Sequence, residues 1–214
     1  MTRDNSDLLC IDLCSGTANF SIAFKNAGWE VITIDIDERC NPTIIMDIRY
    51  VSLERIEMYS KKHNLKAYKE IMVLASPPCE RYSVANHDWP RKGILEALEI
   101  VGVCLELIVE LKEKYPNFRF WALENPRGRL RWFLGKPRDT IRLADYGTPY
   151  QKLTDVWGNI PFKMLEGSKK HTMHLRPHKR GKDGKLKDYL RSDKKLRAKM
   201  PEGLSQAILE AVSN

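Results

Sequence analysis

The sequence predicts an α/β fold in which a doubly wound, mostly parallel β-sheet carries an antiparallel hairpin at one edge. Over residues 8–123, short apolar runs of strand length alternate with segments of helical periodicity. Such alternation is typical of parallel strands whose two faces are both covered by helices. From Arg127 onward, two shorter strand-like runs follow each other without a helix between them, which favours a hairpin. The 214 residues fit a single domain, 1–214.

The first four strands follow from short apolar runs. The run 8–13 ends at Ser15-Gly16, and the segment after it has apolar residues at helical spacing over 20–27 and closes at Gly28. Next come two further strands and a polar helix, which are expected at 31–36, 43–46 and 51–63. The run 71–75 predicts the fourth strand.

The second half of the chain begins with a long amphipathic helix. Apolar residues recur at helical spacing over 94–108, and a fifth strand is expected at 118–123. Four glutamates interrupt the apolar stretch 94–111, which excludes a membrane span there. The hairpin strands are expected at 140–144 and 153–157, and a terminal helix begins after Pro201.

The net charge of +8 is concentrated in one basic segment. Residues 169–199 hold 13 Lys and Arg against three Asp, a net charge of +10, which leaves about −2 for the rest. This segment is a predicted nucleic-acid contact region, because neutralised phosphates release counterions; a solvated basic loop is the alternative. His171, His174 and His178 lie there without cysteines or dense carboxylates, so no metal site is predicted.

The cysteines indicate a reducing environment. They are five in number, an odd count, and lie mostly in apolar segments. No apolar N-terminal segment resembles a secretion signal, so a cytoplasmic location without a membrane partner is expected.

A thiol and a carboxyl group each follow a predicted strand. Cys79 comes after the fourth strand and Pro77-Pro78, and Glu124 comes directly after the fifth. Because ligands of doubly wound sheets bind beyond the carboxyl ends of the strands, these two side chains are expected to share a cleft. Cys79 is the candidate nucleophile and Glu124 the candidate acid.

Acidic residues also accompany the first three strands. Asp12 precedes Gly16, Asp35 and Asp37 end the second strand, and Asp47 ends the third. An acid at the end of the second strand is placed to accept hydrogen bonds from ribose hydroxyls. The sequence has no glycine cluster to cradle a pyrophosphate, so it favours a nucleoside cofactor without phosphates. For Asp37 and Asp47, capping of a helix start is the alternative.

These motifs together resemble those of DNA cytosine-5 methyltransferases. The ones that carry the resemblance are Asp12-Leu13-Cys14-Ser15-Gly16, Asp35-Ile36-Asp37, Asp47-Ile48, Pro77-Pro78-Cys79 and Glu124-Asn125-Pro126, within roughly the first 126 residues. The chain looks like a short, phage-type member without a large target-recognition domain. The resemblance implies a class I methyltransferase (Rossmann-like) fold, S-adenosyl-L-methionine as cofactor, and methyl transfer to C5 of a flipped cytosine in DNA through a cysteine–C6 adduct.

The resemblance also implies roles for individual residues. The catalytic residues are Cys79, Glu124 and Asn125. The cofactor-binding residues are Asp12, Cys14, Gly16, Asp35, Ile36, Asp47, Ile48 and Pro78, and the substrate-binding residues are Pro77, Arg81, Arg127 and Gln151. Arg81 or Arg127 is expected to supply the positive charge that favours the thiolate. The loop 80–92 is a candidate clamp on the nucleic acid.

Three segments depart from the family pattern. The residues after Gly16 include no further glycines, and Met200-Pro201-Glu202-Gly203 stands where a Gly-Asn element is usual. Of the family's Gln-x-Arg-x-Arg element, only Gln151 is kept in Gln151-Lys152-Leu153-Thr154-Asp155. We expect the basic segment, or a partner subunit, to provide target recognition.

Several alternatives stay open at this stage. Ser76-Pro77-Pro78 also resembles the motif of cytosine N4 amino-methyltransferases, although these have an aromatic residue where Cys79 stands. The missing arginines after Gln151 leave room for an inactive protein that binds S-adenosylmethionine and nucleic acid. Neither charge nor motif separates RNA from DNA as substrate, and target sequence, strandedness and oligomeric state stay open.

Overall fold

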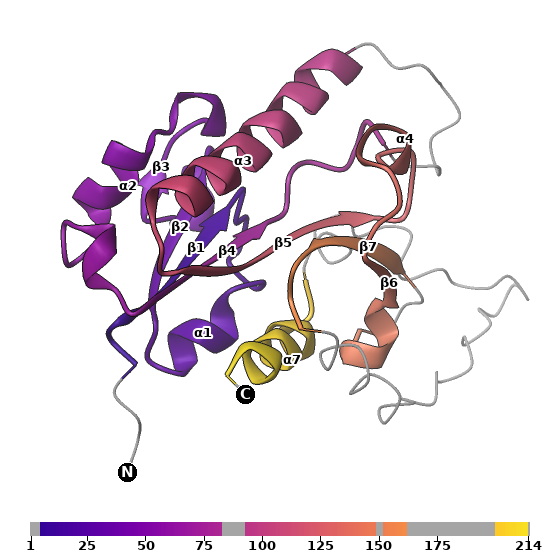
Figure 1. The fold of residues 1–214 in the computed structure, drawn as a ribbon. Coiled ribbons are helices and arrows are strands. Elements are labelled where there is room, and N and C mark those ends of the chain that lie inside the picture. Colours follow the sequence, from indigo (N-terminus) through magenta and orange to yellow (C-terminus); the bar gives the residue numbers. More distant parts are fainter. Residues whose placement is uncertain (1–4, 83–92, 149–151, 162–199, 214) are drawn as a thin grey trace, which may run out of the picture.

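The computed structural model describes residues 5–82, 93–148, 152–161 and 200–213. Within these residues one sheet of seven strands has the order β3-β2-β1-β4-β5-β7-β6 (Figure 1). Strands β1 to β5 run parallel, whereas β7 is antiparallel to both β5 and β6. The predicted doubly wound, mostly parallel sheet with an antiparallel edge is confirmed.

The strands lie close to their predicted positions. They are β1 (Leu8–Leu13), β2 (Glu30–Asp35), β3 (Ile44–Ile45), β4 (Glu70–Ala75), β5 (Phe118–Pro126), β6 (Asp139–Arg142) and β7 (Leu153–Gly158). One difference concerns the candidate acid: Glu124 and Asn125 lie inside β5 and do not follow it. The strand continues there because these two residues pair with Val156 and Asp155 of β7.

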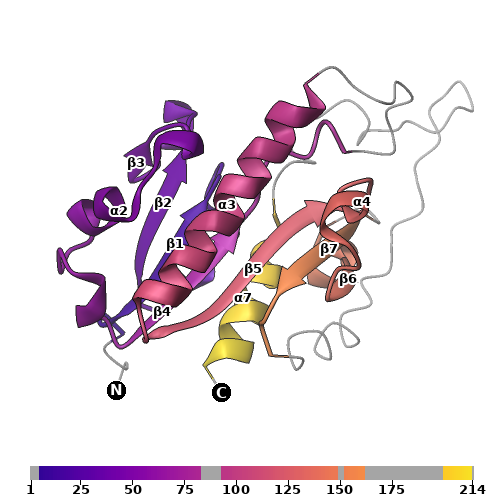
Figure 2. The ribbon, with the colours of Figure 1, turned by 45° about the horizontal axis from the view of Figure 1, so that its top comes forward.

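Helices cover both faces of the sheet (Figures 1 and 2). The short α1 (Ile22–Asn26) packs with the terminal α7 (Glu202–Val212) on one face. The other face is covered by α2 (Leu53–Tyr59) and the long α3 (Ile94–Lys114). A single turn, α4 (Arg131–Leu134), lies beside β6 and β7 (Figure 2). Short 3-10 helices complete the connections: η1 (Glu38–Cys40), η2 (Ile48–Tyr50), η3 (Leu65–Ala67) and η4 (Leu143–Tyr146).

Alternation along the strands divides the core into two clusters. Leu9, Ile11 and Leu13 of β1 pack toward α2 and α3, and Cys10 packs toward α1 and α7. Every residue of β1 after Leu8 is buried, as expected for a central strand with helices on both faces.

Candidate active site

The register of the sheet brings three loops to one place. Leu13 of β1 pairs with Ala75 of β4, and Ala75 pairs with Leu123 of β5. The residues that follow these three positions therefore stand at the same height on the carboxyl edge of the sheet. That edge is where doubly wound sheets bind their ligands.

Cys79 and Glu124 line one cavity at this edge, with a volume of about 270 Å³. The structure thus brings together the two side chains that the sequence places in a common cleft. Cys14, Gly16, Pro77 and Pro78 line the same cavity. Lys152, directly before β7, also lines it, and Asn19 and Met200 contribute from elements far apart in the sequence.

Asn125 faces away from this cavity. It is fully buried, and its side-chain amide donates to the carbonyl of Pro77 at 2.9 Å. Because consecutive strand side chains point to opposite faces, Glu124 reaches the cavity and Asn125 reaches the loop behind it. This placement favours a positioning role for Asn125.

A second set of contacts holds the loop that carries Cys79. The amide of Tyr82 donates to the carbonyl of Cys79 at 3.0 Å, and the carbonyl of Tyr82 accepts from the amide of Arg129 at 2.9 Å. Gly128 lies so close that a Cβ there would be 2.6 Å from the Tyr82 carbonyl oxygen. The Cys79 loop is therefore packed directly on the segment that follows β5.

Among the described residues, Lys152 is the cation whose charge favours the thiolate of Cys79. Burial raises the pKa of Cys79 above its usual value, the charge of Lys152 opposes that rise, and Glu124 adds to it. Arg81 and Arg127, which the sequence suggested for this role, are exposed and neither lines the cavity. Their contact with substrate stays a prediction. A basic residue beside Gln151 was the available signal for Lys152.

Glu124 is a buried carboxyl group with an unusual protonation equilibrium. Burial raises its pKa to about 7, and Lys152 and Thr154 partly oppose the rise. The hydroxyl of Thr154 lies 3.5 Å from Oε1 of Glu124. A substantial fraction of Glu124 is therefore protonated near neutral pH and able to donate a hydrogen bond.

The loop after β1 and the end of β2 form a polar corner beside the cavity. Gly16 has φ +51°, and its amide donates to Asp35 Oδ2 at 2.7 Å; Oδ1 accepts from the amide of Asp37 at 2.9 Å. A carboxylate offers about four acceptor positions, so Asp35 retains capacity for further hydroxyl groups. Next to it, the apolar side chain of Ile36 is 68% exposed. These groups fit a nucleoside.

The other predicted cofactor residues lie deeper or further out. Asp12 is fully buried, accepts from the Ser21 hydroxyl at 2.6 Å, and has a pKa raised to about 7 by burial. Ile48 packs in the core. None of the three acids Asp12, Asp37 and Asp47 lines the cavity.

Asp37 and Asp47 both form caps, as the alternative reading of the sequence proposed. Each accepts from the backbone amide of the arginine two residues later, at the start of a 3-10 helix. Each also forms an ion pair with that same side chain, Arg39 or Arg49. The cofactor-binding role assigned to Asp47 stays a prediction.

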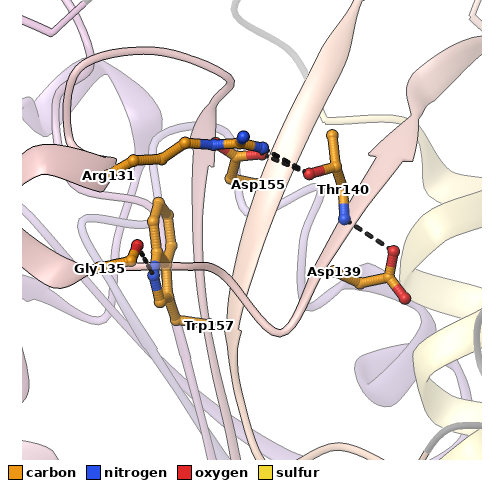
Figure 3. Close-up of polar contacts among 6 residues, drawn as sticks. All are labelled: Arg131, Gly135, Asp139, Thr140, Asp155 and Trp157. Carbon is orange, nitrogen blue, oxygen red and sulfur yellow. Dashed lines mark hydrogen bonds and ion pairs between the residues drawn. The ribbon is translucent and has the colours of Figure 1, made fainter.

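Asp155 stands where the Gln-x-Arg-x-Arg element has its second arginine, so this position carries a carboxylate in place of a guanidinium. Its carboxylate is fully buried and accepts from Nε of Arg131 at 2.5 Å, and Oδ1 also accepts from Thr140 at 2.8 Å (Figure 3). Nη2 of Arg131 donates to the hydroxyl oxygen of Thr140 at 2.6 Å. In this chain α4 supplies the arginine, and β7 supplies the acid.

Some sequence predictions fall on residues outside the described ranges. These are Gln151, most of the candidate clamp 80–92, and the basic segment 169–199 with its three histidines. Within the described ranges, no three His, Cys, Asp or Glu side chains are grouped so that they could hold a metal ion.

The strand order, with an antiparallel seventh strand inserted beside β5, and a cavity at the carboxyl edge define a class I methyltransferase fold. The family model of C-5 cytosine-specific DNA methylases matches residues 8–129, more than half of the chain. The chain belongs to this family, and the resemblance drawn from its motifs is confirmed.

One solved structure provides a further comparison. The structure of the Entamoeba histolytica methyltransferase EhMeth is similar over 80% of this chain, with 14% sequence identity and a TM-score of 0.44. The match covers 57% of that chain, so this protein spans little more than half its length. A search of curated proteins found no match. In the described part of the chain, no helix combines the length and apolar character needed to cross a membrane.

Proposed function

We propose that this protein transfers a methyl group from S-adenosyl-L-methionine to C5 of cytosine in DNA. The observation that carries the proposal is the cavity lined jointly by Cys79 and Glu124, next to the Gly16 loop. Membership in the C-5 cytosine-specific DNA methylase family supports the same substrate class.

In the proposed reaction Cys79 acts as nucleophile. Its thiolate adds to C6 of the cytosine ring, and the electron pair of the C5–C6 double bond makes C5 nucleophilic. Protonated Glu124 donates a hydrogen bond to N3 and stabilises the negative charge that develops on the ring. Transfer of the donor's methyl group to C5 would release S-adenosylhomocysteine; loss of the C5 proton to solvent and cleavage of the S–C6 bond, whose electron pair returns to sulfur, would then restore the thiolate.

The target carbon is inaccessible inside a duplex, so the cytosine must be extruded from the stack. Unstacking costs a few kcal/mol, which contacts in the cavity have to offset. Lys152 would assist the attack on C6 of the extruded cytosine. Its charge favours the thiolate of Cys79, and it also lies beside Glu124. The positions of Pro77 and Pro78 in the cavity wall suit contact with the base and the donor.

The residues around Gly16 and Asp35 are proposed to hold the cofactor, which supplies the methyl group. Asp35 would accept hydrogen bonds from the ribose hydroxyls, and exposed Ile36 would offer apolar surface to the nucleobase. Gly16 has no heavy atom within 4 Å of an added Cβ, so there is space for close approach of a ligand.

The test is incubation with labelled S-adenosylmethionine and cytosine-containing DNA, followed by bisulfite sequencing of the product. We expect incorporation by the wild type, none by Cys79→Ser, and a covalent complex with 5-fluorocytosine DNA. Cys40→Ser, in η1 outside the cavity, is the matched control and should retain activity. Undiminished methylation by Cys79→Ser would refute the mechanism, and an RNA of the same sequence tests the substrate class.

A further inference from the structure

A second basic stretch lies inside the described fold, separate from the basic segment 169–199. Between Asn125 and Asp139 the chain holds five basic residues and no acidic one. The basic residues are Arg127, Arg129, Arg131, Lys136 and Arg138. A surface of this composition suits a polyanion.

The same stretch exposes aromatic rings. The side chain of Trp132 is 67% exposed and that of Phe133 is 45% exposed, both on α4. The guanidinium of Arg129 lies over the Trp132 ring, 6.0 Å from its centre. Arg127, Arg129, Trp132, Phe133, Lys136 and Arg138 are called the α4 surface below; Arg131 is engaged with Asp155.

The α4 surface adjoins the catalytic cavity. Pro126 lines the cavity, and Arg127 is the next residue. The ring of Tyr82, which lies in the Cys79 loop, packs edge-on against Phe133 with centroids 6.4 Å apart. Figures 1 and 2 place α4 beyond the carboxyl end of β5, far from α2.

We propose that the α4 surface binds the DNA strand next to the extruded cytosine, with Trp132 stacked on a neighbouring base. The proposal rests on the function proposed above. Extrusion of one base leaves its neighbours without a stacking partner, and an exposed indole beside the cavity can replace it. Arginine and lysine side chains on both sides of Trp132 would then neutralise the flanking phosphates.

The first experiment measures binding of a fluorescently labelled, cytosine-containing single-stranded DNA by anisotropy. Trp132→Ala should weaken binding about tenfold, within the range measured for loss of one stacking contact, and Trp132→Phe should restore most of it. Tyr59→Ala on α2 is the control, since Tyr59 is an exposed aromatic residue distant from the cavity. It should bind as the wild type does. Circular dichroism verifies that all variants are folded.

The second experiment tests the charges. Arg138→Ala should reduce the slope of log affinity against log salt by about 0.7, the value for one phosphate contact on a single strand. The control Lys66→Ala removes an exposed charge from η3 and should leave the slope unchanged. Wild-type affinity and slope in both Trp132→Ala and Arg138→Ala would overturn the proposal. Tighter Trp132-dependent binding to RNA of the same sequence would overturn DNA as the occupant.

Neither readout requires methyl transfer, so the two proposals fail separately. A wild type that binds DNA through Trp132 without methylating it contradicts the proposed reaction and supports the α4 surface. An active enzyme whose DNA affinity is independent of Trp132 and Arg138 contradicts only the α4 surface.

Discussion

The side-chain amide of Asn125 donates to the carbonyl of Pro77 at 2.9 Å, across 48 residues of sequence. One residue of β5 therefore fixes the loop that carries Cys79, while its neighbour Glu124 reaches the cavity. Because β5 pairs with β4 on one side and β7 on the other, it is a rigid base for this contact. The Glu-Asn-Pro motif of β5 therefore contributes to positioning the loop that carries Cys79.

Asn125→Ala should lower the methyl-transfer rate by about 10- to 100-fold at saturating DNA and donor, since small misplacements of reacting groups carry costs of this order. Asn117→Ala is the matched control. Asn117 lies directly before β5, and its side-chain amide, like that of Asn125, donates to backbone carbonyls, here those of Leu65 and Tyr68. It should lose about 1–3 kcal/mol of stability but keep its rate per folded molecule. Rates that merely follow the folded fraction in both variants would leave Asn125 with no role beyond stability.

The position of the cleft was predictable because it depends on local patterns. The apolar runs that end at Leu13, Ala75 and Leu123 predict three central parallel strands, and the thiol and the acid follow two of these apolar runs. Parallel strands end at one edge, so convergence of these groups follows from topology alone. The resemblance to a known family then adds the chemistry.

What could not be predicted depends on contacts between distant segments. Lys152 reaches the cavity only because β7 pairs antiparallel with β5, and this pairing also extends β5 through Glu124. The raised pKa of Glu124 is likewise a consequence of burial. Asp37 and Asp47 are a different case, because the sequence allowed both a ligand role and a helix cap, and the structure shows that each carboxylate forms a cap.

Lys152→Met should raise the pKa of the Cys79 thiol and slow its alkylation. Without the charge of Lys152 a smaller fraction of the Cys79 thiol is ionised at a given pH, so alkylation by a reagent that attacks the thiolate should be slower. The measurement is iodoacetamide labelling of the Cys79 peptide, followed by mass spectrometry at several pH values. Arg81→Met and Arg127→Met are the controls and should label at the wild-type rate; slowing in these variants, with Lys152→Met unchanged, would assign the role to an arginine.

The pH dependence of kcat/KM should reflect Glu124 and Cys79 together. The proposed reaction requires a protonated Glu124, whose pKa is about 7, and an ionised Cys79, whose pKa is raised. Below pH 7 the rate should rise as thiolate forms, because Glu124 is still protonated. Above pH 7 the gain in thiolate is cancelled by ionisation of Glu124, so the profile should become flat.

Glu124→Gln isolates these two contributions. Its amide does not titrate, so the slower rate of this variant should keep rising through pH 7, by about tenfold per pH unit, until the thiol is ionised. A profile that flattens near pH 7 in Glu124→Gln as well would mean that another group titrates there.

Gly128→Ala should displace the loop that carries Cys79. The added Cβ would lie 2.6 Å from the Tyr82 carbonyl oxygen, a backbone atom that cannot move without the loop. We expect a loss of methyl transfer of at least tenfold, the order of effect that a displaced reacting group produces. Gly102→Ala in α3 is the control, because a Cβ added there meets no heavy atom within 4 Å. It should retain activity and gain up to ~1 kcal/mol of stability. Equal activity of the two variants would show that the loop adapts.

Arg131→Met tests whether the ion pair of α4 holds β7 in place. Removing the guanidinium leaves the carboxylate of Asp155 fully buried without its ionic partner, which typically costs about 3–5 kcal/mol. Urea unfolding should show this loss, and the double variant Arg131→Met/Asp155→Asn should recover part of it, because the charge is then removed as well. Since β7 carries Thr154 and follows Lys152, Arg131→Met should also slow methyl transfer under conditions where it is fully folded. Unchanged stability in the single variant would mean that strand pairing alone holds β7 in place and that the Arg131–Asp155 ion pair does not contribute.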